Sequence, residues 1–355
     1  MKNVFVISLL LMSLRPAGAM LYWDANGATL GAGGPTPTGT WGVDAYWSTN
    51  AYGFGSATQG WDPNNAAVFS AAGDAIGTFT VNVSGPQTAK SLIFEEGNVT
   101  LSGGSLNLTD AGGPVKVEFP ATATLNSALT GANGLTKFDL GLLILKRTNT
   151  YAGATVVQEG VLQLGATGVI PKNSALVITN LTATRATFAT GGFSQSLGPL
   201  RVQGVDSTLQ RVIDFGNGAS ALVFADSSLE DWNGLPLLIV NYTPGVDSLR
   251  FGTGSTGLTT TQLALMRFTD FADAIGQIDT QGFVTPVLPS GARAQLTWAA
   301  ADNRSYRVQY KDHLEDADWT DLVPDVPALG TTASTIDTSV TAAKRFYRIA
   351  VVPLP

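Results

Sequence analysis

Apolar and polar residues alternate with a period of two along most of the chain beyond residue 66. The same spacing recurs at Val99 and Leu101, Leu106 and Leu108, Val115, Val117 and Phe119, Leu143 and Leu145, and Leu162 and Leu164. Successive side chains of a β-strand point to opposite faces, so each run predicts a strand with one buried face. Val115, Val117 and Phe119 are expected to point to one face, and Lys116 and Glu118 to the other.

Turn residues interrupt these runs about every ten residues, as at Ser102-Gly103-Gly104 and Gly216-Asn217-Gly218. Regularly spaced short strands are typical of a sandwich, a barrel or a solenoid. Weak self-similarity without interleaved helices favours the solenoid. One helix is expected over residues 259–268, with Thr260 or Thr261 as its N-cap.

The alternation becomes cleaner near the C-terminus, with Leu296 and Trp298, then Tyr306, Val308 and Tyr310, then Tyr347, Ile349 and Val351. Polar residues such as Arg307 and Arg348 occupy the positions between them. One dry and one wet face is the pattern of antiparallel sheets. Residues 288–355 are therefore predicted to form a small antiparallel β-sandwich.

Residues 20–65 are rich in turns and contain Trp23, Trp41, Trp47 and Trp61. Because buried aromatic side chains mostly serve packing, the favoured interpretation is a cluster that caps one end of a long β-structure. The alternative interpretation is an aromatic platform that contacts a glycan. Both hypotheses stay open at the level of the sequence.

Composition supports an all-β chain and argues against several classes of partner and of site. Charged residues make up 13% of the 355 residues, about half the usual share. The net charge of −7 argues against binding to nucleic acid or to anionic membrane surfaces. The absence of cysteine excludes disulfides, zinc–thiolate sites and cysteine nucleophiles.

The N-terminus has the pattern of an export signal. Lys2 precedes an apolar run from Val4 to Leu14, and Ala17-Gly18-Ala19 fits a small-residue cleavage site. We expect cleavage after Ala19. No later stretch is long and apolar enough to predict a transmembrane helix.

Candidate catalytic residues are few. His313 is the only histidine and lies in a polar stretch, so a Ser-His-Asp triad or a two-histidine metal site is not expected. Glu95-Glu96 and Glu230-Asp231 are carboxylate pairs of the kind that glycosidases use, but neighbours on a strand face opposite ways. Five dispersed acids could be gathered by folding into the metal site of a polysaccharide lyase: Asp206, Asp214, Asp226, Glu230 and Asp231. The prediction is a non-enzyme without a cofactor.

A Ca²⁺ site is the one metal hypothesis that the sequence offers. Asp312, Glu315, Asp316 and Asp318 form the densest acidic group and carry the oxygen ligands that Ca²⁺ prefers. Their spacing lacks the glycine turn and terminal glutamate of an EF-hand loop. A solvated surface loop is therefore the favoured interpretation.

One segment resembles a known repeat. Gly134-Leu135-Thr136-Lys137, Leu143-Ile144-Leu145, Asn149-Thr150-Tyr151-Ala152-Gly153 and Gly160-Val161-Leu162-Gln163-Leu164 follow the order and spacing of an autotransporter-associated β-strand repeat over residues 131–165. The chain departs from that pattern at Phe138-Asp139-Leu140, where the repeat has a glycine-containing turn. The resemblance implies a right-handed parallel β-helix in an exported, passenger-like protein.

Residues 288–353 resemble a fibronectin-type-III-like module whose first strand is short or absent. We therefore predict four segments: a signal peptide (1–19), a Trp-rich cap (20–65), a β-helix (66–285) and a fibronectin-type-III-like sandwich (288–355). The predicted function is that of an exported, non-enzymatic structural or adhesive protein of a Gram-negative bacterium. The alternative is a β-helix that binds or cleaves polysaccharide. Surface glycans or surface proteins are the expected partners, at the cell surface or outside the cell, with the periplasm as the other location.

Overall fold

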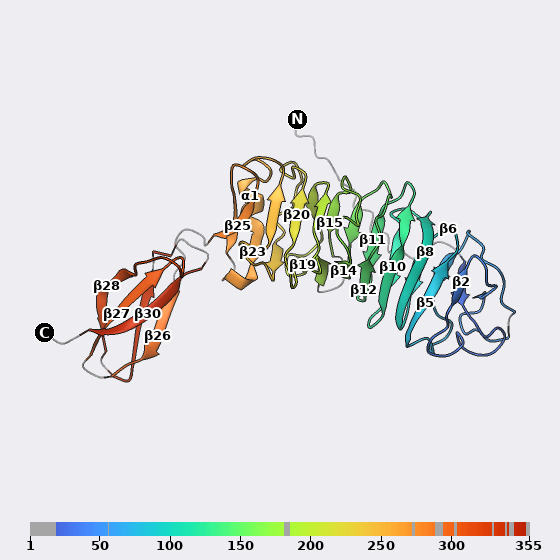
Figure 1. Ribbon diagram of the computed structural model, residues 1–355, viewed down its shortest axis with the longest axis horizontal. Helices are drawn as coiled ribbons and strands as arrows, with labels where there is room; N and C mark the ends of the chain where they lie inside the picture. The colour runs from blue at the N-terminus through green and yellow to red at the C-terminus, as the bar shows by residue number, and fades with distance from the viewer. Residues whose placement is uncertain are drawn as a thin grey trace, which may run out of the picture.

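The protein is an elongated, almost wholly β-structured molecule (Figure 1). The computed structural model describes residues 19–55, 57–180, 185–271, 274–287, 294–301, 304–328, 330–337, 339–340 and 344–352. A β-solenoid of about eight turns is followed by small antiparallel sheets. The predicted signal peptide lies outside the described residues apart from Ala19, so its cleavage stays a prediction.

The solenoid coils through three faces in turn. The first face holds β1 (Met20–Trp23), β4 (Ala66–Val68), β7 (Leu92–Phe94), β9 (Pro114–Val117), β11 (Leu135–Phe138), β13 (Thr155–Val157), β15 (Leu176–Ile178) and β18 (Leu200–Val202), with β3 (Trp47–Ser48) antiparallel at its edge. The second face holds β2 (Gly39–Trp41), β5 (Thr78–Val83), β8 (Asn98–Leu108), β10 (Thr122–Thr130), β12 (Leu142–Leu145), β14 (Gly160–Leu164), β16 (Arg185–Ala189), β19 (Gln210–Asp214), β21 (Leu237–Val240) and β23 (Met266–Phe268). The third face holds β6 (Pro86–Ala89), the later halves of β8 and β10, then β17 (Gln195–Leu197), β20 (Ala221–Phe224) and β22 (Ser248–Phe251).

Adjacent strands within a face belong to successive turns. The register pairs Thr122 with Leu142 in one step and Leu142 with Val161 in the next, so about twenty residues complete a turn here. The pairing is parallel, which confirms a parallel β-solenoid. The right-handed sense of its coil stays a prediction.

The core is built by stacking one residue from each turn upon the next. In the second face the register aligns a column of fully buried side chains: Ala123, Leu143, Leu162, Phe188, Ile213, Ile239 and Phe268. Burial of each leucine, isoleucine or phenylalanine side chain in this column contributes roughly 1.5–3 kcal/mol. The period-two alternation predicted from the sequence is therefore confirmed for these strands.

The segment that resembles the repeat spans β11 to β14. The Asn149 side chain accepts a hydrogen bond from the Leu129 amide at 2.6 Å and donates one to the Val169 carbonyl at 2.8 Å. One asparagine thus joins the turn before it to the turn after it. Nearby, the buried Tyr151 hydroxyl lies 2.7 Å from the Thr155 hydroxyl, which lies 2.9 Å from that of Ser174. These hydrogen bonds give the buried polar side chains of the Asn-Thr-Tyr segment their partners.

Two details of the predicted strands are wrong. Phe119 is 76% exposed and not inward, because β9 ends at Val117 and the chain turns toward β10. Gly103 and Gly104 do not separate two strands. They lie inside β8 with φ of 88° and 42°, where the chain passes from the second face to the third. Positive φ is accessible to glycine at little cost. The strand bends here, and its register with β10 shifts between Ser102 and Ser105.

The corner between β11 and β12 is where Phe138-Asp139-Leu140 departs from the repeat pattern. Asp139 has φ of 67°, a conformation that favours glycine and that costs roughly 1–2 kcal/mol for most other residues. Its side chain lies 3.8 Å from the Lys116 ammonium, and this partly exposed pair contributes little.

We expect Asp139→Ala to lower the free energy of unfolding by about 1 kcal/mol, and Asp139→Gly to preserve or raise it. Urea unfolding of the full chain measures both. Asp139→Asn is the matched control, because it removes the charge and keeps a side chain that tolerates positive φ. An Ala variant as stable as the Gly variant would show that φ is not the cause.

The C-terminal end of the solenoid contains the predicted helix in shortened form. Helix α1 covers Thr260–Leu265 and is capped by Thr259, one residue before the predicted caps. Residues 266–268 form β23 instead of continuing the helix. The Gln262 amide donates to the Ser227 and Glu230 carbonyls at 2.8 and 2.7 Å, which fixes the helix on the preceding turn. The short helix η1 (Thr269–Phe271) and the hairpin of β24 (Ile275–Ile278) and β25 (Val284–Val287) complete this end.

Beyond the solenoid, two small antiparallel sheets share a modest core. One pairs β26 (Ala294–Ala299) with β29 (Thr332–Asp337), and the other has the order β28 (Thr320–Pro327), β27 (Ser305–Lys311), β30 (Phe346–Val352). Tyr306, Ala328 and Ala333 are buried together, with Trp298 against them. The pairing is antiparallel as predicted, while the fibronectin-type-III-like assignment stays a prediction.

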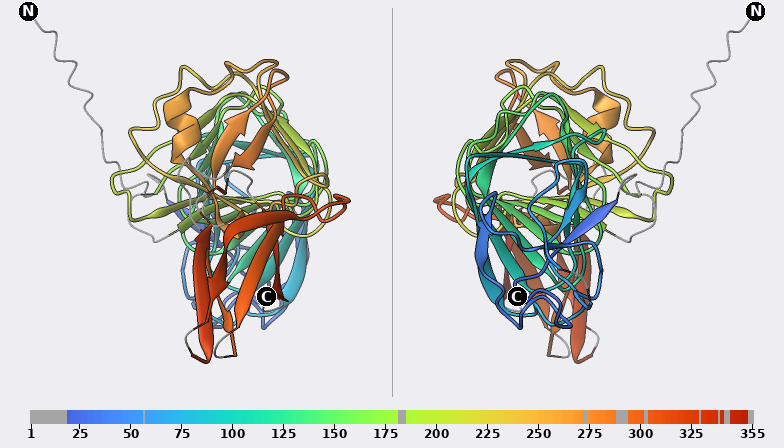
Figure 2. Two further views of the ribbon diagram at one scale, coloured as in Figure 1. Left: turned by 90° about the vertical axis from the view of Figure 1, so that its left-hand side faces the viewer. Right: turned by 90° about the vertical axis from the view of Figure 1, so that its right-hand side faces the viewer.

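The predicted Trp-rich cap merges with the solenoid. Met20 of β1 pairs with Ala66 and Gly39 of β2 pairs with Val81, so both strands extend the solenoid faces. The connecting loops lie across the lower part of that end when the molecule is viewed along its length (Figure 2, right).

Candidate binding site at the tryptophan-rich end

Three of the four N-terminal tryptophans are core residues. Trp23, Trp41 and Trp47 have no exposed surface, and the Trp47 ring centroid lies 5.1 Å from that of Trp23 and 5.4 Å from that of Trp41. Phe69 continues the cluster inward by stacking on Phe94 at 4.9 Å. A glycan cannot reach these three rings while the end of the solenoid stays folded. The geometry is that of a packed cap.

Trp61 differs from the other three because its ring is only half-buried. Its indole nitrogen donates to the Thr88 carbonyl at 2.7 Å, while Trp47 and Trp41 lie behind the ring at centroid distances of 4.4 and 4.9 Å. These contacts fix the orientation of the ring. Of the predicted glycan-contact residues, Trp61 alone keeps indole surface open to solvent.

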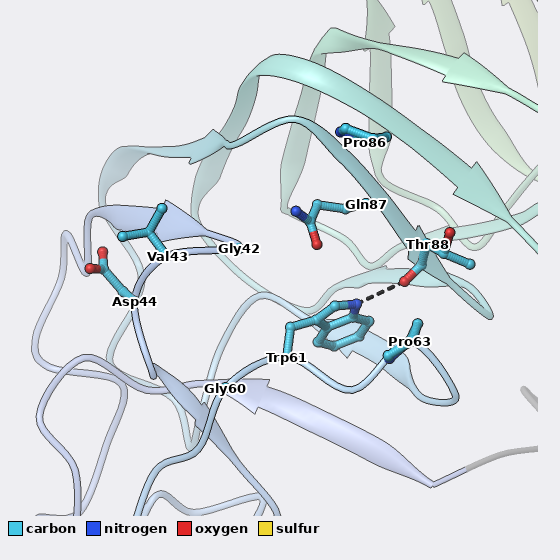
Figure 3. Close-up of a pocket in the computed structure, with 9 residues that line it drawn as sticks. All are labelled: Gly42, Val43, Asp44, Gly60, Trp61, Pro63, Pro86, Gln87 and Thr88. Atoms are coloured by element: carbon cyan, nitrogen blue, oxygen red, sulfur yellow. Dashed lines mark hydrogen bonds between the residues drawn. The ribbon is translucent and has the colours of Figure 1, made fainter.

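A surface pocket of about 370 Å³ adjoins this ring (Figure 3). Three segments form it: the turn after β2, the loop before β4, and β6. Its lining residues are Gly42, Val43, Asp44, Gly60, Trp61, Pro63, Pro86, Gln87 and Thr88. Residues 42 and 88 come together because β2 and β6 each pair with neighbouring strands of the same sheet.

The polar groups of the pocket are held by the backbone. Asp44 Oδ2 accepts from the Thr40 amide at 2.7 Å, and Gln87 Nε2 donates to the Ser84 carbonyl at 2.7 Å. Gly42 has φ of 93°, and a Cβ there would lie 2.3 Å from Gln87 Nε2. Glycine at position 42 thus leaves room for the glutamine. Sequence reasoning missed Asp44 and Gln87, because nothing local marks two polar residues so far apart in the chain as neighbours.

The four acidic residues of the predicted Ca²⁺ site do not converge. Asp312 forms an ion pair with Arg345 at 2.7 Å, and Asp316 accepts from the His313 amide at 3.2 Å. Glu315 and Asp318 are exposed. Across the part of the chain that the structure describes, no group of three or more His, Asp or Glu side chains is placed to hold a metal ion. His313 is itself exposed, as predicted for a surface residue.

Three of the four paired candidate carboxylates, Glu96, Glu230 and Asp231, form local structural contacts. Glu96 accepts from the Ser70 hydroxyl at 2.6 Å and from the Ala75 amide at 2.9 Å. Burial, and then the neighbouring Glu118 carboxylate, raise the pKa of Glu95 above its ordinary value. Glu230 forms an ion pair with Arg201 at 2.8 Å, and Asp231 accepts from the Asn233 amide.

The dispersed acids Asp206, Asp214 and Asp226 stay apart in the structure. Each accepts a hydrogen bond from the backbone amide two residues later, those of Thr208, Gly216 and Ser228. This is the local bond by which aspartate stabilises turns. Among the described residues, they do not join a group of three or more acidic or histidine side chains that could hold a metal ion.

Lys137 and Arg345 are two of the cationic side chains that the structure buries. Lys137 points into the core, and its ammonium donates to the carbonyls of Phe138, Asp139 and Glu159. Burial lowers the pKa of Lys137 to about 7, against the opposing attraction of Asp139 and Glu159. In the C-terminal sheets, the Arg345 side chain is 4% exposed and bridges Asp312 and Asp337.

No helix among the described residues is long and apolar enough to cross a membrane. The chain is 36% identical over 163 residues to the adhesin BmaC autotransporter of Brucella suis biovar 1 (strain 1330). The match covers 45% of this chain and 4% of that adhesin, so the chain spans a small part of the relative's length. No family model and no solved structure matches the chain.

Proposed function

We propose that this chain is an exported, non-enzymatic protein that acts in adhesion at the surface of a Gram-negative bacterium. The observation that carries the proposal is the similarity to an autotransporter adhesin, together with the β-solenoid that this chain forms. The antiparallel sheets at the C-terminus, which we take to be a fibronectin-type-III-like module, would serve as a further contact domain.

The shape and chemistry of the molecule support an adhesive role. A solenoid is extended because each turn contacts only its neighbours, and it offers long surfaces for binding. The tryptophan-rich end and the C-terminal sheets lie at opposite ends of the long axis (Figure 1). Among the candidate carboxylates, Glu96 accepts hydrogen bonds from Ser70 and Ala75, Glu230 pairs with Arg201, and Asp231 accepts from the Asn233 amide, which gives these three structural roles.

Surface protease treatment of the native host, followed by detection with an antibody to this chain, tests the location. We expect the chain to be lost from intact cells, and a strain lacking it to attach less well to its substratum. A protected periplasmic chain, or unchanged attachment, would contradict the proposal. So would polysaccharide turnover by purified protein that a single substitution abolishes, which would favour the alternative of a polysaccharide-cleaving solenoid.

A further inference from the structure

We propose that the pocket beside Trp61 binds one neutral pyranose residue of a glycan. The inference rests on the proposed adhesive function and assigns a ligand class to one site. It uses a single tryptophan of the four that the sequence offered, together with Asp44 and Gln87. Its parts are a fixed aromatic surface, two hydrogen-bond acceptors and rigid walls.

The aromatic surface is prepared before any ligand arrives. The hydrogen bond to Thr88 and the rings of Trp41 and Trp47 hold the Trp61 indole in one orientation. A pyranose has an apolar face of C–H groups that can pack against such a ring. Because the ring is already ordered, binding does not incur the usual entropy cost of fixing a large side chain. The hydrogen bond also satisfies the indole N–H, which leaves the ring free to act as an apolar surface.

The polar groups suit the hydroxyls of a sugar. Asp44 Oδ2 and Gln87 Nε2 are used by the backbone, and among the described residues nothing donates to Asp44 Oδ1 or Gln87 Oε1. Both free oxygens are acceptors, and sugar hydroxyls are donors. The Asp44 carboxylate lies at the rim of the pocket, beside Val43 and turned away from the Trp61 ring (Figure 3). Its charge, on a chain of net charge −7, disfavours uronic and sialic acids. The ligand class is therefore a neutral pyranose.

The size and the walls of the pocket limit which ligands it can bind. Its volume of about 370 Å³ is near the lower end of small-molecule pockets, roughly 300–1,000 Å³. Pro63 and Pro86 are stiff residues on two sides, and Gly42 keeps the space that a side chain would fill. One sugar ring fits this space better than a chain segment does. The strands β2 and β6 beside the pocket lie at the end of the molecule away from the C-terminal sheets (Figure 1).

The test uses saturation-transfer NMR on the purified full chain, with the methyl glycosides of glucose, galactose, mannose and N-acetylglucosamine as probes. Methyl glucuronide is the charged comparison. We expect at least one neutral glycoside to bind and the glucuronide not to bind. Asp44→Asn and Gln87→Ala should each weaken binding by about tenfold or more, because each removes or weakens a hydrogen bond to the ligand. Trp61→Ala should abolish it.

Tyr52→Ala is the matched control, since Tyr52 is a 66% exposed aromatic residue of the same end that does not line the pocket. It should bind like the parent chain. If Trp61→Ala alters the fold, the Asp44 and Gln87 variants still decide. The proposal fails if no neutral glycoside binds, or if binding survives the Asp44 and Gln87 substitutions unchanged. Because the assay uses purified protein, failure here leaves surface location and adhesion untouched, and a periplasmic location leaves the pocket untouched.

Discussion

Replacing Arg345 by methionine is expected to unfold the C-terminal sheets at temperatures where the solenoid stays folded. The guanidinium donates to Asp312 at 2.7 and 3.1 Å and to Asp337 at 2.9 Å, and it lies 3.8 Å from the centroid of the Tyr310 ring. Asp337 is fully buried, so the variant would leave its carboxylate without a counter-charge. Removal of one partner from a buried pair costs about 3–5 kcal/mol. A domain of this size is only marginally stable, because a small domain buries a small share of its surface.

Thermal unfolding followed by limited proteolysis of the full chain measures this effect. We expect the C-terminal sheets of Arg345→Met to be cleaved while the solenoid resists. Arg348→Met is the matched control, because Arg348 is an exposed neighbour whose guanidinium contacts Gln309 and lies over Trp319. It should cost less than about 1 kcal/mol. Equal sensitivity of the two variants would show that the buried bridge is not what stabilises these sheets.

Replacing Lys137 by methionine is expected to remove a pH dependence from the stability of the solenoid. The pKa of Lys137 is about 7 in the folded chain and about 10.4 in an unfolded one, so the unfolded state binds more protons between these values. The contribution of Lys137 to stability therefore rises with pH across that window, by up to about 1.4 kcal/mol per pH unit, and is lowest below pH 7. Methionine has a similar length and does not titrate.

Urea unfolding of both chains at pH 7, 8, 9 and 10 gives the difference in free energy at each pH. Other titrating groups contribute equally to both chains, so their effect cancels. The free energy of unfolding of the parent chain should increase relative to that of the variant as the pH rises. A difference that stays constant or shrinks would mean that the three carbonyls around the ammonium keep Lys137 charged in the folded state.

Much of the solenoid could be predicted from local sequence. Leu143, Leu145, Leu162 and Leu164 predict buried strand positions because the strand period acts over neighbouring residues. The inward position of Lys137 could not be predicted in this way. It lies in register with Val115 and Val157, and its charge is tolerated because the corners of two turns supply carbonyls. That arrangement depends on how turns stack.

The candidate site, too, could be predicted only in part from local sequence. The Trp-rich segment marks the correct end of the molecule, but the four tryptophans look alike in sequence. The packing of β1, β2 and β3 on the first turns buries the other three tryptophans and leaves Trp61 half-buried. The sequence alone does not show this packing. Asp44 and Gln87 meet because β2 and β6 belong to one sheet, a contact that no local pattern encodes.

The parallel register between turns has a mechanical consequence. The backbone hydrogen bonds of each face run from one turn to the next, and so lie along the long axis of the solenoid. A force that separates the two ends therefore loads these bonds in series, and the turns can detach one after another. Each released turn adds a length of extended chain before the next must yield. Under tension the molecule would lengthen in steps and dissipate work, while a sheet sheared along its strands would resist until it broke all at once.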